Sequence, residues 1–204
     1  MKNSLILIGG GGHCKSCIDV IEQEKKYSIA GIVDVPEKKG QTVLGYPISA
    51  CDEDIPGLAR NFLLFIALGQ IKSAEKRVRL YAELKKHGAS LPTIISPYAY
   101  VSKHAEIGSG TIVMHGATVN ADARIGDNCI INSHALIEHD AVIHNHCHIA
   151  TGAVINGGVR VGEQTFIGCR SMTREYITIG AGSFVAGGMN IYYDLPEQSK
   201  VKPK

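Results

Sequence analysis

A repeat of six residues governs the second half of the chain. From Val101 to Ile191, every sixth residue is valine or isoleucine at fifteen of sixteen positions, and the exception is Thr173. An amphipathic helix repeats near 3.6 residues, and an ordinary strand alternates at two and then stops. A register that never slips over this length fits neither pattern. It predicts a solenoid in which each hexad forms one short strand and a corner.

Each position of the hexad has a structural role. The branched aliphatic residue points inward and stacks on its equivalent one coil away, at a distance of about 4.8 Å. The position four residues later is mostly small, which suits the place where two faces meet; examples are Ala117, Ala123, Cys129, Ala135, Ala141, Cys147 and Ala153. Asparagine and glycine supply the corner conformations that branched residues resist. We expect about five triangular coils, with a bulge or local loop in the irregular hexad Thr173–Thr178.

This pattern resembles the bacterial hexapeptide-repeat acyltransferases, whose solenoid is a left-handed parallel β-helix. The left-handed sense is implied by the resemblance, since most parallel crossovers are right-handed. The resemblance also implies a homotrimer that holds an acyl-CoA between neighbouring solenoids. A triangular prism with flat sides suits such packing, because identical sides close into threefold symmetry.

The first half of the chain reads as a small α/β domain. Apolar runs predict strands and amphipathic stretches predict helices: strands over 5–8, 29–33, within 61–68 and over 93–95, and helices over 14–25 and 73–86. Strands that alternate with helices imply a parallel sheet. We therefore expect a Rossmann-like domain over residues 1–97 and the left-handed β-helix over residues 98–204.

A glycine-rich turn follows the first predicted strand. Gly9–Gly12 precede His13 at the start of a helix, where backbone N–H groups can approach a phosphate. Asp34 ends the second strand, at the place where such folds hold a ribose or base. Gly69 follows the third strand. The turn therefore favours a nucleotide ligand, and a tight turn without a ligand is the alternative.

The combination of both halves resembles the UDP-4-amino-sugar N-acetyltransferases of bacterial glycan pathways (PglD-type). It also resembles the sialic acid O-acetyltransferases (NeuD-type), and the resemblance covers nearly the whole chain. Its most specific stretches are 132–140, which reads NSHALIEHD, and 148–153, which reads HIATGA. The resemblance implies that His139 is the catalytic histidine and that His148 lies at the acetyl-CoA site. His148 favours the amino-sugar group.

The resemblance also assigns roles to individual positions. In the catalytic site it implies Asp140 and Glu138 as acidic neighbours of His139 and Asn132 as a polar contact. For the nucleotide sugar it implies Gly10, Gly11 and His13 at the diphosphate, Asp34 at the uridine, and Gly69 and Gln70 as further contacts. For acetyl-CoA it implies Gly157, Cys169 and Gly187 beside His148. A helix-capping role is the alternative for His13.

The proposed chemistry suits a histidine. Acetyl transfer to an amine needs a group that accepts the amine proton, and imidazole titrates near neutral pH. In an extended strand the side chains of Glu138 and Asp140 would point away from His139, but a corner breaks this alternation. One coil from His139 is position 157, so Gly157 leaves room beside the base. A surface histidine beside acids is the alternative reading.

The sequence thus predicts direct acetyl transfer from acetyl-CoA to the 4-amine of a UDP-linked 4-amino-4,6-dideoxy sugar. A sialic acid O-acetyltransferase and a non-catalytic nucleotide-sugar-binding protein are the alternatives. Zinc is not expected, because His144 and His146 lack the spacing of a converging ligand set. The tail Ser199–Lys204 departs from the G-x-P-A-K-like end of the family, which puts its contact with CoA in doubt.

Composition excludes other classes of protein. The net charge of +2 gives no support for nucleic acid as a partner. No apolar run approaches the ~20 residues of a membrane span, and the run before the glycines is too short for a signal peptide. We therefore expect a cytoplasmic protein with free thiols. The spacing of Cys14 and Cys17 suits redox or zinc chemistry, but without a second pair it favours a structural role.

Overall fold

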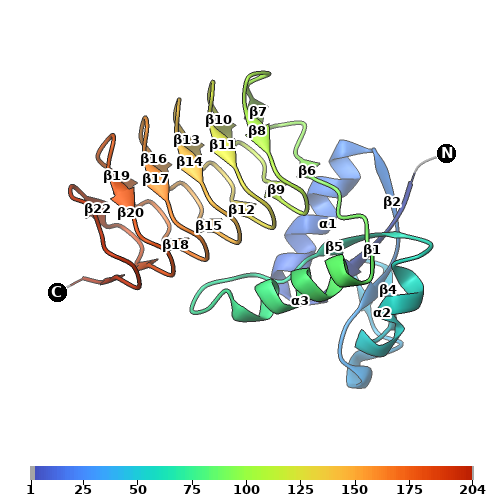
Figure 1. Cartoon of the computed structure of the whole chain (residues 1–204). Coiled ribbons are helices and arrows are strands. Elements are labelled where there is room, and N and C mark those ends of the chain that lie inside the picture. The colour runs from blue at the N-terminus through green and yellow to red at the C-terminus, as the bar shows by residue number, and fades with distance from the viewer. Residues whose placement is uncertain (1–2, 204) are drawn as a thin grey trace.

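The computed structural model describes residues 3–203 and places an α/β unit at the N-terminal end of a long solenoid (Figure 1). The elements of the α/β unit are β1 (Asn3–Ile8), α1 (Gly12–Glu24), β2 (Tyr27–Val33), β3 (Thr42–Val43), β4 (Tyr46–Ala50), α2 (Ile55–Leu58), β5 (Leu63–Ile66) and α3 (Glu75–Lys86). Two short 3₁₀ helices cover Pro36–Lys38 and Asp52–Asp54.

The sheet of the α/β unit has the order β3-β4-β2-β1-β5. All pairings are parallel except β3 with β4, which form a small antiparallel ribbon. Three of the four strands predicted for this half, and both helices, are present in the α/β unit, with ends shifted by a few residues. The sequence reasoning missed β3 and β4, because both are short and lack a strong apolar run. The order changes direction at β1, so the carboxyl ends of β1, β2 and β5 meet at one edge.

The solenoid consists of two-residue strands in three parallel sheets, in agreement with the predicted left-handed β-helix. The sheet that faces the α/β unit, here called the docking sheet, contains β6 (Ile94–Ile95), β9 (Ile112–Val113), β12 (Ile130–Ile131), β15 (His148–Ile149), β18 (Phe166–Ile167), β21 (Phe184–Val185) and β23 (Lys200–Val201).

The other two sheets meet at a corner opposite the docking sheet, here called the outer corner. The second sheet contains β7 (Tyr100–Val101), β10 (Thr118–Val119), β13 (Leu136–Ile137), β16 (Val154–Ile155), β19 (Met172–Thr173) and β22 (Asn190–Ile191). The third contains β8 (Glu106–Ile107), β11 (Arg124–Ile125), β14 (Val142–Ile143), β17 (Arg160–Val161) and β20 (Thr178–Ile179). In Figure 1 the outer-corner turns form the upper row of loop tips.

The solenoid core is the predicted stack of aliphatic and small residues. Ile131 lies opposite Val113 on one side and Ile149 on the other, and all three are fully buried. The small residues Cys129 and Cys147 are also buried and belong to the same cluster. Cys129 and Cys147 therefore stack as core residues, as the spacing of 18 residues predicts.

The corners repeat with the same period as the core. Backbone φ is positive at every sixth residue through the solenoid, namely Gly110, Gly116, Asp122, Asn128, His134, Asp140, His146, Gly152, Gly158, Gln164, Arg170, Tyr176, Gly182 and Gly188. Several of these residues carry side chains for which this conformation is uncommon. The regular coil therefore imposes the corner conformation even where the residue does not favour it.

Three details of the solenoid correct the sequence reasoning. The strand at Ile94–Ile95 exists but pairs with β9, so it opens the solenoid and does not belong to the α/β sheet. The hexad Thr173–Thr178 was expected to bulge, but β19 and β20 keep the register, because Thr173 fills the inward position fully buried. The regular spacing breaks later, between β22 and β23.

The α/β unit packs on the docking sheet through α1 and α3. Outward side chains of this sheet, Ile112 and Ile130, join one apolar cluster with Ile18 and Ile21 of α1. Cys14 and Cys17 lie in the same cluster, fully buried and reduced. Burial raises the pKa of the Cys14 thiol to about 11 and raises the pKa of Cys17 as well. These thiols are core residues, as predicted, and are not reactive nucleophiles.

Arg77 of α3 ties the two parts together. The side chain is 2% exposed and donates to the carbonyl oxygens of Ile66 and Leu68 at 3.1 and 2.6 Å. It also donates to the backbone oxygen and Oδ1 of Asn128, at 3.0 and 2.6 Å. Asn128 is one of the solenoid corners. The end of β5 is thereby fixed relative to the coil.

None of the helices within residues 3–203 combines the length and the apolar character that crossing a bilayer requires.

Candidate active site

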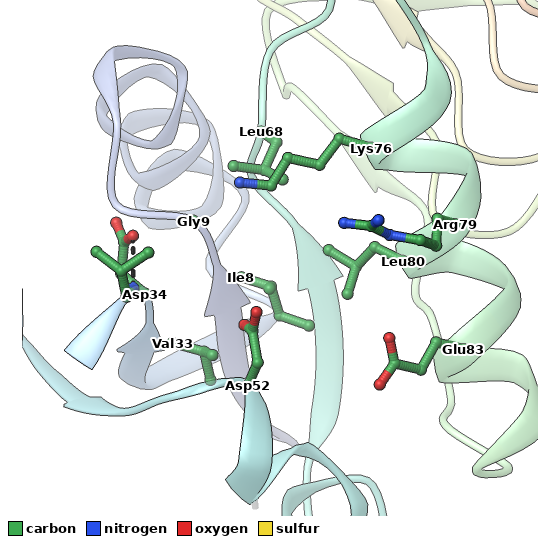
Figure 2. Close-up of a pocket in the computed structure, with 11 residues that line it drawn as sticks. Ile8, Gly9, Val33, Asp34, Asp52, Leu68, Lys76, Arg79, Leu80 and Glu83 are labelled. Carbon is green, nitrogen blue, oxygen red and sulfur yellow. Dashed lines mark hydrogen bonds between the residues drawn. The ribbon is translucent and has the colours of Figure 1, made fainter.

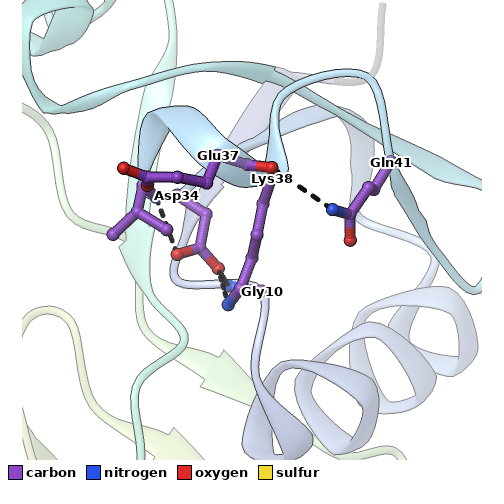
Figure 3. A network of polar contacts seen from close by, with 6 residues as sticks. Gly10, Asp34, Glu37, Lys38 and Gln41 are labelled. Atoms are coloured by element: carbon purple, nitrogen blue, oxygen red, sulfur yellow. Dashed lines mark hydrogen bonds and ion pairs between the residues drawn. The ribbon is translucent and has the colours of Figure 1, made fainter.

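The glycine-rich turn and Asp34 form one polar network at the sheet edge (Figure 3). The Gly10 N–H donates to Asp34 Oδ2 at 2.8 Å, and the Val35 N–H donates to Oδ1 at 2.8 Å. The Lys38 ammonium donates to Oδ2 at 2.9 Å. Partial burial alone would raise the pKa of Asp34, but these hydrogen bonds outweigh it and hold the pKa below its usual range. Asp34 therefore stays ionised and anchors the turn.

Gly10 leaves no room for a side chain. An added Cβ would lie 2.9 Å from Asp34 Oδ2 and 3.2 Å from Ile48 Cδ1. The next residue, Gly11, is the N-cap of α1, and a Cβ there would meet nothing within 4 Å. The first turn of α1 contains no acidic residue. The N–H groups of this helix terminus therefore face an open space that suits an anion.

A pocket opens beside this network at the carboxyl ends of β1, β2 and β5 (Figure 2). Its lining residues are Ile8, Gly9, Val33, Asp34, Val35, Asp52, Leu68, Lys76, Arg79, Leu80 and Glu83. Sequence reasoning anticipated Asp34 here but not Asp52, Lys76, Arg79 or Glu83. These four side chains come from the 3₁₀ helix after β4 and from α3, and only tertiary packing brings them to the edge.

The seam between the α/β unit and the docking sheet holds a second polar group. The carbonyl oxygen of Gln70 accepts a hydrogen bond from His148 Nδ1, and Gln70 Nε2 donates to the His146 carbonyl at 3.0 Å. Asn132 Nδ2 lies 3.1 Å from His148 Nε2. Asn132, which the family resemblance placed with His139, thus contacts His148 within one chain.

Both histidines of the seam are held neutral. Burial, followed by the nearby Arg77, lowers the pKa of His148 to about 4, although its bond to Gln70 opposes the shift. Burial and the charge of Arg77 lower the pKa of His13 to about 3. Within the described residues, His13 Nε2 is buried and has no hydrogen-bond partner. His13 also lies against Gly69, where an added Cβ would be 3.5 Å from the His13 Cβ.

His139 lies at the outer corner, on the far side of the prism from these groups. The residue after it, Asp140, has φ 61°, so the corner breaks the strand alternation and turns its carboxylate toward the imidazole. Asp140 Oδ2 lies 2.8 Å from His139 Nδ1. This hydrogen bond, together with the charges of Asp140 and Glu138, raises the pKa of His139 against the opposing effect of desolvation. The side chain is 55% exposed.

The surroundings of His139 fix its orientation. Because Nδ1 faces a carboxylate, Nδ1 carries the proton and Nε2 presents its lone pair to solvent. Glu138 turns away and accepts a hydrogen bond from Asn120 at 2.9 Å. An added Cβ at Gly157, one coil further, would lie 2.7 Å from His139 Cε1 and 2.8 Å from Nε2. The glycine therefore provides the space into which the free imidazole nitrogen points.

Cys169 and Gly187 lie at another corner, beside the docking sheet. Cys169 is exposed, and an added Cβ at Gly187 would lie 3.2 Å from the Cys169 carbonyl oxygen. Within a single chain, the expected site residues therefore lie in three separate places: the sheet edge and seam, the outer corner, and this third corner. Among residues 3–203, no three His, Cys, Asp or Glu side chains converge as metal ligands.

Comparisons with known proteins agree with this architecture. The family model described as PglD N-terminal domain matches residues 4–84, and the bacterial transferase hexapeptide model matches residues 122–157. Comparison with curated protein sequences gives no match. A histidine variant of perosamine N-acetyltransferase from Caulobacter crescentus, solved with CoA and GDP-perosamine, is 34% identical with a TM-score of 0.90 and covers 98% of this chain and 93% of that one.

Two further solved structures share the fold. The acetyltransferase domain of PglB from Neisseria gonorrhoeae, in complex with acetyl coenzyme A, is 29% identical with a TM-score of 0.90, covering 98% of this chain and 96% of that one. WeeI from Acinetobacter baumannii is 21% identical with a TM-score of 0.85, covering 97% and 96%, and shows the fold alone.

Fold and comparisons together define the class, which is that of the acetyl-CoA-dependent transferases built on hexapeptide repeats. Within it, the chain belongs to the sugar N-acetyltransferases of the PglD/NeuD type. The predicted fold class, family and enzyme class are therefore confirmed.

Proposed function

We propose that the enzyme transfers the acetyl group of acetyl-CoA to the 4-amine of a nucleotide-linked 4-amino-4,6-dideoxy sugar, with His139 as general base. The observation that carries this proposal is the His139 imidazole, held by Asp140 at Nδ1 and free at Nε2 above the gap at Gly157. An oriented imidazole with one free nitrogen is what proton removal from an amine requires.

The reaction follows from this geometry. The neutral amine attacks the thioester carbonyl carbon, and the carbonyl electrons move to oxygen in a tetrahedral intermediate. His139 Nε2 accepts the amine proton and later returns it to the departing CoA thiolate. Asp140 stabilises the imidazolium that forms in between. The Gly157 N–H, which has no acceptor among the described residues, is our candidate donor to the oxyanion.

The same pKa shift sets the pH dependence. Asp140 raises the pKa of His139, so the free enzyme holds the imidazole protonated to a higher pH than an isolated histidine. The base is active only when neutral, and activity is therefore expected to rise as pH increases through that pKa. General base catalysis of this kind contributes about 10²–10⁴-fold.

We assign the nucleotide sugar to the sheet edge. Its diphosphate would sit beside Gly10 and Gly11, on the N–H groups at the start of α1 that the Gly10–Asp34 bond leaves free, with Asp34 at the ribose, and Gly69, Gln70 and His13 beyond them. The Caulobacter relative contains GDP-perosamine, so UDP is not the only carrier found in the family. The division of labour we propose places nucleotide-sugar binding in residues 1–97 and acetyl transfer in residues 98–204.

A complete site on this proposal needs two copies of the chain. The outer corner that carries His139 lies opposite the docking sheet, where the nucleotide edge sits. A sugar held by one copy therefore reaches the base of a neighbour, and a homotrimer provides such neighbours for all copies. We place acetyl-CoA in the same groove, along Gly157, His148, Cys169 and Gly187. A cytoplasmic setting fits, because its cosubstrate is made there and the thiols are free.

The test is acetyl transfer by the purified enzyme. With acetyl-CoA and a GDP- or UDP-linked 4-amino-4,6-dideoxy sugar, we expect free thiol and a product heavier by one acetyl group. His139→Asn should lower kcat by about 10²–10⁴-fold. The matched control His144→Asn removes an exposed histidine at the next corner of the same coil and should keep full activity. Acetylation of a sialic acid in place of the amine, or full activity of His139→Asn, would overturn the proposal.

A further inference from the structure

The pocket in Figure 2 contains charged side chains that the glycine turn does not use. Asp52, Lys76, Arg79 and Glu83 line it together with Asp34. Asp34 already accepts three hydrogen bonds, from Gly10, Val35 and Lys38. Within residues 3–203, the other four side chains form no hydrogen bond or ion pair with one another. Two carboxylates and two cations thus face one pocket with their polar atoms free to bind a ligand.

The order of these groups along the pocket resembles the order of parts in a nucleotide. Gly9 lies at the phosphate end proposed above and Asp34 at the ribose, and Lys76 reaches from α3 toward Gly9 (Figure 2). Asp52 and Arg79 lie further from the glycine turn. A nucleoside whose diphosphate rests on the α1 terminus would therefore extend its base toward Asp52 and Arg79.

The middle of the pocket suits a flat ring. Ile8 and Val33 form a buried apolar floor, and Val35, Leu68 and Leu80 are the other aliphatic residues of the lining. Asp52 points into the pocket from one wall, and Arg79 reaches in from the helix on the other wall (Figure 2). A planar base between these walls would contact one carboxylate and one guanidinium at opposite parts of its edge.

The two charged groups distinguish between bases. An ionised carboxylate only accepts hydrogen bonds, and it binds best where two donors lie side by side. Guanine offers such a pair, N1–H and the N2 amino group, and carries O6 and N7 acceptors for an arginine. Uracil offers a single N3–H between two carbonyl oxygens, so the second carboxylate oxygen would face a carbonyl.

We propose that this pocket selects a guanine base, with Asp52 accepting from N1–H and the N2 amino group and Arg79 donating to O6. The substrate is then a GDP-linked amino sugar, in place of the UDP-linked sugar that the sequence suggested. This inference rests on the proposed function, because it assumes that the sheet edge holds the nucleotide of the acceptor substrate. It adds Asp52 and Arg79 as the residues that determine base specificity.

The test compares nucleoside diphosphates by calorimetry on the wild-type enzyme. Inosine diphosphate keeps O6 and N1–H of the guanine but lacks the N2 amino group, so it removes one of the two bonds to Asp52. We expect GDP to bind about tenfold more tightly than inosine diphosphate and about tenfold to a hundredfold more tightly than UDP. Equal binding of GDP and inosine diphosphate, or tighter binding of UDP, would overturn the proposal.

Two variants locate the effect. Asp52→Asn should weaken GDP binding by about tenfold and abolish the difference in affinity between GDP and inosine diphosphate. Arg79→Met should lower the affinities for GDP and inosine diphosphate equally, because both bases carry O6. The control Glu53→Gln removes the same charge from the same 3₁₀ helix without lining the pocket, and its affinities should equal those of the wild type. An Asp52→Asn enzyme that keeps the full difference overturns the assignment, and thermal melting verifies that each variant is folded.

The outcomes separate this inference from the proposed function. An enzyme that acetylates a UDP-linked amino sugar and prefers UDP keeps the proposed function and removes the inference. Selective GDP binding without acetyl transfer to any nucleotide-linked amine keeps the pocket assignment and removes the proposed function.

Discussion

The solenoid and the α/β unit build their cores from contacts of different range along the chain. In the solenoid, Ile131 packs between Val113 and Ile149, each one coil away. In the α/β unit, Leu7 of β1 pairs with Phe65 of β5, far along the sequence. A stack of near neighbours adds stability coil by coil, whereas a sheet of distant strands forms as a whole.

The difference extends to the functional groups. The solenoid offers one corner after another in fixed geometry, and a single side chain at one corner, His139, supplies the base that we propose. The α/β unit assembles its pocket from strand ends, a 3₁₀ helix and one side of α3, which meet only in the folded state. The enzyme thus combines a rigid row of corners with a pocket that depends on long-range contacts, and Arg77 joins the two.

The largest expected effect comes from removing the Arg77 hydrogen bonds between the α/β unit and the solenoid. Arg77→Met leaves the carbonyl oxygens of Leu68 and Asn128 buried without a donor, and we expect a loss of about 3–5 kcal/mol from the unfolding free energy of the α/β unit. Calorimetry should then resolve two transitions, with the solenoid melting last. Arg60→Met, which changes an exposed arginine, is the control. A single unshifted transition in Arg77→Met would contradict the assigned role.

The next effect concerns the outer corner. Gly157→Ala places a methyl group 2.7 Å from His139 Cε1, and the exposed imidazole has to move away. We expect kcat to fall by about 10²-fold, because a displacement of about 1 Å of a catalytic group has this cost. The melting temperature should hardly change. Gly57→Ala, at a position where an added Cβ meets nothing within 4 Å, serves as the control. Unchanged kcat in Gly157→Ala would show that the gap is not needed.

These two predictions also show what the sequence could and could not give. The inward residues were predicted because a six-residue register repeats without interruption, and the position of Gly157 beside His139 follows from the same period. The corner conformation at Asp140 followed only partly, because positive φ at a residue such as Tyr176 is imposed by the coil. Sequence reasoning therefore predicted the solenoid far better than its corners.

The α/β unit was predicted less completely. The strands β1, β2 and β5 were visible as apolar runs, but β3 and β4 were not. The roles that we propose for Asp52 and Arg79 depend on which elements the fold brings to one pocket, and no local pattern contains that information. Arg77 looked like an ordinary helix charge, and only the fold buries it against Asn128. The glycine turn and Asp34 were found because the strand–turn–helix order is a local signal.

The seam between the two regions should respond to acid. His148 has a pKa of about 4 in the folded protein and an ordinary value of 6.5. Between these two pKa values, the unfolded chain therefore binds a proton at this histidine, and the folded chain does not. The contribution of the neutral His148 to the free energy of unfolding is fully present above pH 6.5. It is lost as pH falls toward 4, at up to about 1.4 kcal/mol per pH unit.

Urea unfolding at several pH values measures this slope. His148→Gln should be less stable at neutral pH and should lose less stability between pH 6.5 and 4 than the wild type does. The exposed histidine of His104→Gln provides the control and should leave the slope unaltered. Parallel curves for the wild type and His148→Gln would be incompatible with a buried neutral imidazole.

The smallest expected effect is a shift of the pH profile. Asp140→Asn removes the hydrogen-bonded charge that raises the pKa of His139, so the acid limb of kcat/KM should move to lower pH. The control Asp122→Asn changes the aspartate at the same corner position one coil earlier, where no histidine precedes it. Its profile should match that of the wild type. An acid limb that stays in place or moves up in Asp140→Asn would argue against the assigned contact.

The central claim is that the base of one copy serves the sugar bound by another, and mixed oligomers test it most directly. His139→Ala removes the base. Gly11→Asp places a carboxylate at the N-cap of α1, where it fits and stabilises the helix but repels a diphosphate. Each variant alone should be inactive. Trimers assembled from equal amounts of the two should regain about a quarter of the wild-type activity, because one site in four combines an intact base with an intact nucleotide site. Mixed oligomers that remain inactive would contradict a shared site.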